Sequence, residues 1–363
     1  MTTILFRYML REYLKIFFMC FAGLMTIYLV VDFFEKVRRF IRFDAEVIHI
    51  LLFFLLRMPA IAFQIAPLAV LMATLLTLGM LSRNHEITAM RSCGISLSRT
   101  ALPFFVCASL IAVGLFGLSA VIVPLTNARA EYVKTALIEK KNPVAILKTL
   151  RPWMQLENQS LLNIDGMEPD GLTLHGIRLY RLGRHFELME ITEAKETRYT
   201  SQGWVMQNGL TRLLSPQGAV TVREFETKPL ALSHSPEDFR TGLSVESDEL
   251  TLKDLRARIA RLQQDGYNVS RLLTDYHGRI AFPFVSIVMA LVGIALSLKQ
   301  TGRGGGMAIG IGQALVIGFL YWAAYSVAIA LGRSGVMAPM LAGWMTNLLF
   351  LSYGWYLYLK VSH

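Results

Sequence analysis

Long apolar runs constrain this chain more than any other feature of its sequence. The first, 16–31, carries no charged residue, and with flanking side chains reaching the interface it is long enough to cross a bilayer. Five more spans are predicted at 51–81, 100–126, 280–298, 307–331 and 336–359. Because the hydrophobic residues, 54% of the chain, gather in these runs, we predict an α-helical integral membrane protein with six transmembrane helices.

The stretch between the third and fourth spans has a different character. Short alternating segments at 153–157, 160–164, 174–182, 204–208 and 219–225 are separated by turn signals at 158–159, 165–166, 170–171, 201–203 and 215–218. Strands at this spacing predict an inserted all-β domain, an antiparallel sandwich or barrel. Thr251 and Asp254 then predict a helix start, and Gly266 predicts its end. The expected domains are 1–135 with three spans, the β-domain 136–250, a connecting helix 251–272, and 273–363 with three more spans.

The connection between the second and third spans, at about 82–97, is short and amphipathic. Ile87, Met90 and Ile95 are its apolar residues, and Arg83, His85, Glu86 and Arg91 are its charged or titratable ones. Gly94 stops the helical pattern. We therefore predict a short helix lying flat on the membrane face, where a soluble protein could push on it.

Charge excludes one class of partner and leaves orientation open. The formal net charge is +10, which in a soluble chain would suggest nucleic acid. Here Lys and Arg flank membrane spans and contact lipid phosphates, so no nucleic-acid partner is predicted. With the N-terminus inside, the outer ends of the spans carry at least as many cations as the inner ends, so the positive-inside rule does not decide the orientation.

Basic residues gather where the first and third spans end. They are Lys36, Arg38, Arg39, Arg42, Arg129 and Lys134. On a helix the first four make two adjacent basic faces, because their spacings are three and four residues. One interpretation is anchoring to lipid headgroups. The other is recognition of an anionic amphiphile at the outer interface, beside an apolar cavity.

No cofactor and no metal are predicted. A zinc-protease pattern starting at His85-Glu86 would need a second His at Ala89, and the glycine loop at 302–306 lacks the Gly-Lys-Ser/Thr ending of a phosphate-binding loop. Small residues recur every four positions in the fifth span and let helices approach closely. They are Gly306, Gly310 and Gly318, with Ala308 and Ala314.

Several of these residues resemble the signature of one family. Leu78-Gly79-Met80-Leu81 followed by 86–94 (EITAMRSCG) resembles the LptF/LptG (YjgP/YjgQ) permeases of lipopolysaccharide export. The segment 279–283 (RIAFP) and the later Leu331-Gly332, Pro339 and Trp344 agree with it. The resemblance covers essentially the whole chain, and the C-terminal spans favour the LptG-like branch.

The resemblance implies a non-catalytic ABC transporter permease in the bacterial inner membrane, with cytoplasmic termini and a periplasmic β-jelly-roll-like domain. It implies that 82–97 is the coupling helix, that the basic residues bind lipopolysaccharide, and that the first and fifth spans form gates packed by the three glycines. The implied coupling residues are Arg83, His85, Glu86, Met90, Arg91 and Gly94. The implied partners are a second homologous permease (LptF-like), a cytoplasmic ATPase dimer (LptB-like), a single-span regulatory subunit (LptC-like) and a periplasmic bridge protein (LptA-like).

The residues leave another class of function open, a membrane scaffold or sensor whose soluble domain binds a partner without transport. Co-purification with an ATPase and ATP-dependent lipid release would separate the two. An intramembrane hydrolase is less favoured, because no His, Ser or Asp constellation lies in the predicted spans.

Overall fold

The computed structural model divides the chain into two compact units, residues 1–133 with 247–363, and residues 134–246. Each unit is described by itself. The described residues are 2–43, 45–139, 153–156, 160–168, 172–183, 187–200, 203–214, 220–230, 232, 247–264, 267–299 and 307–362. The turn signals at 158–159, 170–171 and 215–218, Gly266 and the glycine loop 302–306 lie outside them.

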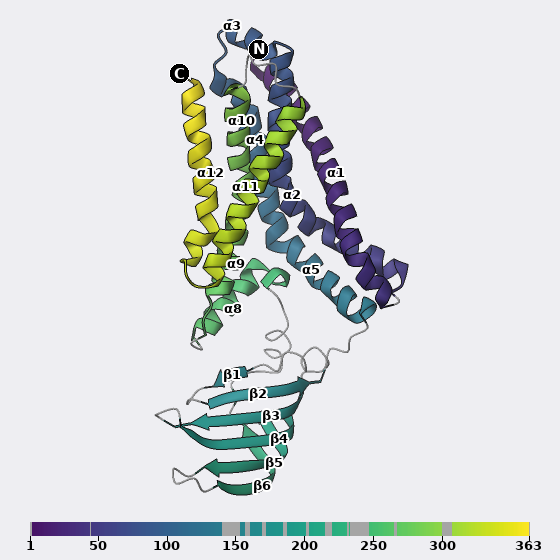
Figure 1. The fold of residues 1–363 in the computed structure, drawn as a ribbon, viewed down its shortest axis with the longest axis vertical. Coiled ribbons are helices and arrows are strands. Elements are labelled where there is room, and N and C mark those ends of the chain that lie inside the picture. The colour runs from purple at the N-terminus through teal and green to yellow at the C-terminus, as the bar shows by residue number, and fades with distance from the viewer. Residues whose placement is uncertain are drawn as a thin grey trace. The chain divides into compact units, whose positions relative to one another are not determined.

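The first unit is a bundle of helices (Figure 1). Its N-terminal part holds α1 (Thr2–Arg42), α2 (Val47–Arg83), α3 (Glu86–Ser92), α4 (Leu97–Gly117), the π-helical turn η1 (Leu118–Ile122) and α5 (Val123–Tyr132), which η2 (Val133–Ile138) continues. Its C-terminal part holds η3 (Ser247–Glu249), α8 (Leu252–Gln264), α9 (Ser270–Ala281), the 3₁₀ turn η4 (Phe282–Phe284), α10 (Val285–Lys299), α11 (Met307–Arg333) and α12 (Pro339–Ser362).

Five helical stretches are long and apolar enough to cross a membrane. They are 4–42, 47–83, 98–138, 270–298 and 309–333. With the inserted sheet, they confirm a helical membrane protein with a β-domain in the middle of the chain. The sixth predicted span overlaps α12, which is not among these five stretches, and it stays a prediction.

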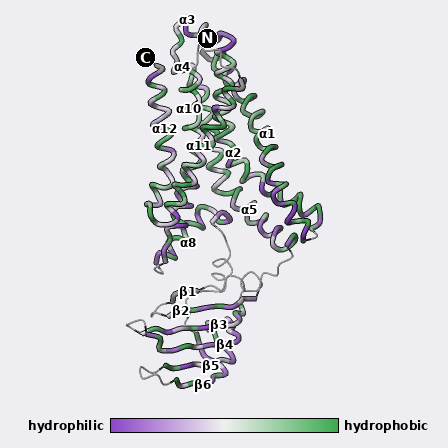
Figure 2. Tube along the Cα trace, viewed as in Figure 1, coloured by the Kyte–Doolittle hydropathy of each residue, from purple (hydrophilic) through white to green (hydrophobic). Residues whose placement is uncertain are grey.

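Helix α2 lies at the centre of the bundle and packs against α1, α5, α10 and α11. The most apolar windows of α2 and of the α9–α10 stretch are 78% buried, whereas those of α1 and α11 are only 17% buried. Figure 2 shows that the apolar residues follow these helices along their length. Helices α1 and α11 therefore present most of their apolar surface to lipid or to another protein.

Two helix boundaries differ from the predictions for identifiable reasons. The fourth spanning helix begins at Ser270, ten residues before the predicted start, because a polar, helix-compatible segment precedes its apolar part. The third is interrupted by the π turn Leu118–Ile122. Pro124 follows directly, and a proline both lacks an N–H and crowds the carbonyl one turn earlier, so the turn widens there.

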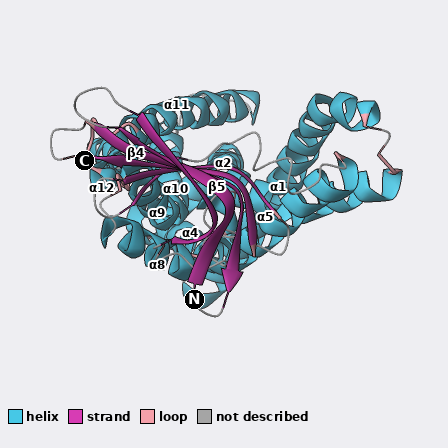
Figure 3. Ribbon diagram, turned by 90° about the horizontal axis from the view of Figure 1, so that it is seen from below, coloured by secondary structure: helices cyan, strands magenta, loops and turns pink. Residues whose placement is uncertain are grey.

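The second unit contains one antiparallel sheet whose strands pair in chain order, and Figure 3 shows them bending along their length. The strands are β1 (Trp153–Leu156), β2 (Ser160–Met167), β3 (Thr173–Leu182), β4 (Leu188–Thr200), β5 (Gly203–Leu214) and β6 (Val220–Leu230). Its core includes Leu162, Ile177, Trp204 and Met206. Among the described residues the strands make one layer, whereas a jelly roll has two.

Two sequence predictions in this unit are wrong. Strand β4 was not predicted, because Thr192, Ala194 and Thr197, which it buries, are small or polar and hide its alternation. The predicted turn at Asp165-Gly166 lies inside β2. Asp165 is instead bonded to Arg178 of the next strand, Nη2 to Oδ2 3.1 Å, which keeps this polar pair in the sheet.

One line across the sheet interrupts the pairing of strands β2 to β6. The register skips Asp165, Gly176, Lys195, Asn208 and Glu226, one residue in each strand. Two of them have left-handed backbone, with φ of 64° at Gly176 and 53° at Asn208. Since such residues turn a strand out of its line, the sheet bends where they stand in a row.

Candidate functional site

Helix α3 is held down by two apolar side chains and exposes the rest. Ile87 and Met90 are 2% and 8% exposed and belong to the same apolar cluster as Met9 of α1 and Leu81 of α2. Met90, predicted as a coupling residue, is therefore an anchor beneath the helix. Arg83, His85, Arg91 and Gly94 are exposed.

Helix α3 is shorter than the segment 82–97 predicted from the sequence. His85 has φ 60° at its start, and Gly94 has φ 78° after its end. Gly94 N–H bonds to Arg91 O at 2.9 Å and Ile95 N–H to Met90 O at 3.0 Å, which is a Schellman ending. The predicted stop at Gly94 is confirmed, but the helix covers only 86–92, since these two left-handed residues end it on both sides.

Glu86 opens α3 and is half-buried. Its carboxylate accepts hydrogen bonds from Tyr8 Oη of α1, at 3.4 Å, and from Asn84 Nδ2, at 3.3 Å. The position at a helix start favours a negative charge. The carboxylate is thus aimed by α1 and remains accessible to a cation of another protein.

At the other end of α1, the structure separates the predicted basic residues into two kinds. Lys36 forms an ion pair with Asp32, whose side chain is only 8% exposed, and lies 5.9 Å from the centre of the Phe53 ring of α2. Arg57 of α2 lies over the same ring at 5.7 Å. Lys36 is therefore a neutralised cation that packs α1 onto α2.

Arg38, Arg39 and Arg42 are exposed on the last turns of α1. Arg39 and Arg42 lie in the final turn, where positive charge is favoured by the helix dipole. Arg129 is exposed on α5, and Lys134 belongs to η2 in the second unit. Figure 1 shows that the ends of α1 and α5 lie toward the same end of the bundle, opposite to α3.

Gly310 and Gly318 of α11 face the interior of this chain. A Cβ at Gly310 would contact Leu76 at 3.7 Å, and one at Gly318 would meet Leu68 at 2.6 Å, so both lie against α2. Ala314 between them is fully buried, and Gly306 lies outside the described residues. The opposite face of α11 carries exposed Phe319 and Leu320, which are 72% and 54% exposed.

Sequence reasoning missed three residues at these places. Tyr8 bonds Glu86 across the chain, and nothing in the sequence indicates that pairing. Asp32 could have been found, because it stands four residues before Lys36, the spacing of a helical ion pair. Arg57 could have been found in the same way, because it follows Phe53 of the same helix α2 by four residues, the spacing at which helical side chains meet.

The sequence is similar to a known protein family. The family profile described as the lipopolysaccharide export system permease LptF/LptG matches residues 7–360, nearly the whole chain. A search of curated protein sequences gave no match.

Proposed function

Since this chain belongs to the LptF/LptG family of lipopolysaccharide export permeases, we propose that it is one permease subunit of an ABC transporter that extracts lipopolysaccharide from the inner membrane. The lipid is then passed to a periplasmic bridge protein. Residues 134–246 lie in the periplasm, both termini lie in the cytoplasm, and the chain is the LptG-like of two permease subunits. The profile match over both units supports the permease role, and the branch and the topology rest on the sequence resemblance.

Helix α1 is the observation that carries the mechanism. Its 41 residues extend about 60 Å at 1.5 Å per residue, twice the hydrocarbon thickness of a bilayer. One end is bonded to the carboxylate of α3, and the other end carries Arg38 and Arg42. Only 17% of the most apolar window of α1 is buried in this chain, whereas Met9, Tyr13 and Phe40 are fully packed, so a shift of α1 costs least where its apolar surface is exposed.

The partner ATPase moves the permease by pushing on α3. A cytoplasmic ATPase dimer hydrolyses ATP and engages the exposed residues around Glu86, while Ile87 and Met90 transmit its movement to the apolar cluster beneath. The resulting tilt of α1, and of α11 beside α2, closes the cavity that two homologous permeases form. Expulsion of the lipid then follows from its lower affinity for the closed cavity.

The lipid is recognised by its anionic groups. Lipopolysaccharide presents phosphates on a broad acylated body, and exposed arginines at the outer interface bind phosphate in two-pronged fashion. Arg38 and Arg42 stand one turn apart on the same face, so they can hold one phosphate group together. Lys36 contributes less, because Asp32 already neutralises it.

The lipid passes next along the β unit, residues 134–246. Strand β6 is an edge strand with Val220 and Val222 exposed, at 56% and 55%. An extended strand of the bridge protein can add to such an edge through main-chain hydrogen bonds. A single-span regulatory subunit is the remaining partner.

A matched pair of double variants tests this function. Arg38→Ala with Arg42→Ala should weaken crosslinking of lipopolysaccharide to the assembled transporter, while ATP hydrolysis persists. Arg7→Ala with Arg11→Ala removes two equally exposed, equally spaced charges from the other end of α1 and should leave that crosslink intact. If both doubles weaken lipid capture alike, the outer arginines are general headgroup anchors and the substrate-binding proposal fails.

A further inference from the structure

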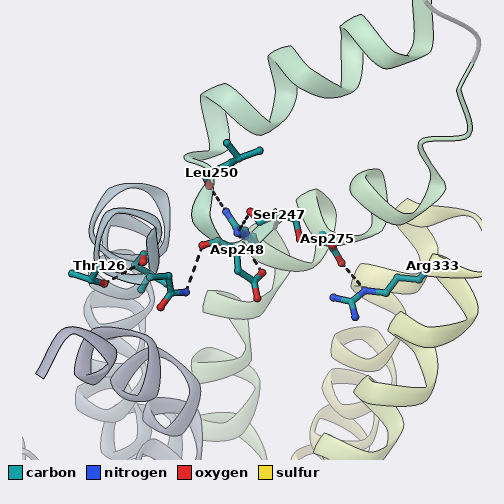
Figure 4. A network of polar contacts seen from close by, with 9 residues as sticks. Thr126, Ser247, Asp248, Leu250, Asp275 and Arg333 are labelled. Carbon is teal, nitrogen blue, oxygen red and sulfur yellow. Dashed lines mark hydrogen bonds and ion pairs between the residues drawn. The ribbon is translucent and has the colours of Figure 1, made fainter. Parts of the chain in front are cut away.

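A compact polar cluster occupies the end of the bundle opposite α3 (Figure 4). At its centre is the segment 247–250, where the chain returns to the helical unit. Arg279 of α9 donates from Nη1 to Leu250 O at 2.6 Å and from Nη2 to Ser247 O, and its Nη2 lies 3.4 Å from Asp248 Oδ1. The Arg279 guanidinium therefore contacts three residues of the returning segment.

The same segment is tied to α11 through a buried carboxylate. Asp275 of α9, whose side chain is 4% exposed, accepts from Ser247 Oγ at 2.6 Å and from Arg333 Nε at 2.7 Å. Arg333 is the last residue of α11 and its side chain is 45% exposed. A buried carboxylate is stabilised only while both donors stay in place, so the end of α11 and Ser247 cannot separate independently.

The outgoing chain joins this cluster as well. Asn127 of α5 places Nδ2 3.5 Å from Asp248 O, and α5 packs against η3. Asn127 stands six residues before Val133, the last residue of the helical unit before the chain leaves it. Both connections to residues 134–246 are thus attached to each other and to α9, and through Asp275 to α11.

We propose that Asp275 and Arg279 are positioning residues that transmit displacement of α11 into the two connections leading to the β unit. This 247–250 clamp is made of Ser247, Asp248, Leu250, Asp275, Arg279 and Arg333. It rests on the proposed function in one respect, because the displacement of α11 belongs to the transport cycle. It depends on no particular placement of the β unit, since every contact lies within the helical unit.

The test uses the complete transporter in lipid nanodiscs and two readouts. Asp275→Asn keeps the volume but removes the charge, and Arg333→Ala removes the guanidinium donor. Each should speed hydrogen exchange of the 247–252 amides at least about tenfold, the factor that corresponds to loss of one charge-assisted bond. Each should also lower the lipid released per ATP hydrolysed several-fold, while ATP hydrolysis continues. Arg271→Ala, an exposed cation on the same helix α9, is the control and should change neither readout.

The outcomes are distinguishable. Faster exchange with unchanged lipid released per ATP would make the cluster a structural brace only and would overturn the transmission role. Unchanged exchange in both variants would overturn the clamp itself. If the unmodified transporter releases no lipid with ATP at all, the proposed function fails first, whatever the exchange rates show.

Discussion

Replacing Asn347 by Leu should destabilise the helical unit by about 2 kcal/mol. Asn347 is 5% exposed in α12, accepts from Tyr321 Oη at 2.6 Å, and donates from Nδ2 to Ala281 O at 2.8 Å. Ala281 O is available because the helix changes to a 3₁₀ turn there, and Val285 N–H bonds to Phe282 O instead. Leu has the same branching and the same number of side-chain heavy atoms but leaves a hydroxyl and a carbonyl without partners.

The magnitude follows from these two groups. A buried group without a partner costs about 1–3 kcal/mol in soluble proteins, which for two groups gives an upper range of about 2–6. Between membrane helices the average is nearer 0.6 kcal/mol per interaction, with a maximum near 1.7, because the unfolded helices find other partners in the bilayer; two interactions then give about 1.2, with a maximum of about 3.4. A value of about 2 kcal/mol lies where the two ranges meet.

Equilibrium unfolding in mixed micelles, followed by circular dichroism, measures the effect. Tyr321→Phe should cost about 1 kcal/mol, since it leaves only the Asn347 oxygen unpaired. The double variant leaves only the Ala281 carbonyl without its partner and should cost about 1 kcal/mol, about 2 kcal/mol less than the sum of the two single costs. Ser352→Ala, an exposed residue of the same helix, is the control. Additive costs, or an Asn347→Leu midpoint equal to that of the control, would refute the reasoning.

Three other predictions concern the remaining surfaces. Cys93 is exposed beside α3 and should resist an impermeant thiol reagent added to the periplasm, whereas Val222→Cys on β6 should react; the reverse pattern would invert the proposed orientation. Glu86→Lys should fold normally, since the site is half-exposed, yet lose assembly with the ATPase; normal co-purification and transport would contradict the coupling role. Burial raises the pKa of Glu190, but hydrogen bonds from Lys228 and Thr192 and the nearby Arg181 outweigh it and hold that pKa below the usual value. The carboxylate therefore stabilises the fold above about pH 4.5, and this contribution is lost as pH falls through the folded pKa. The melting temperatures of the unmodified protein and of Glu190→Gln should therefore differ more at pH 7 than at pH 3.

Helix positions and helix ends that depend on local pattern could be predicted from the amino-acid sequence. Uncharged runs required spanning helices, and Thr251 with Asp254 marked the start of α8, where Asp254 N–H does bond to Thr251 Oγ1 at 3.2 Å. Gly94 marked the end of α3 in the same way, because only a residue that tolerates positive φ can close that turn. Glu86 and the arginines at the end of α1 could be singled out by charge and spacing together with the family resemblance, and their roles stay predictions.

Which of these side chains already contact other parts of the chain depends on how the helices pack. Lys36 and Arg38 look alike in the sequence, yet Lys36 lies over the Phe53 ring of α2, while Arg38 is exposed. Gly310 and Gly318 of α11 could have faced any neighbour, and it is the packing on α2 that directs them inward. Contacts such as Tyr8 with Glu86 join residues 78 positions apart, and a local pattern carries no information about such a pairing, because it depends on how whole helices pack.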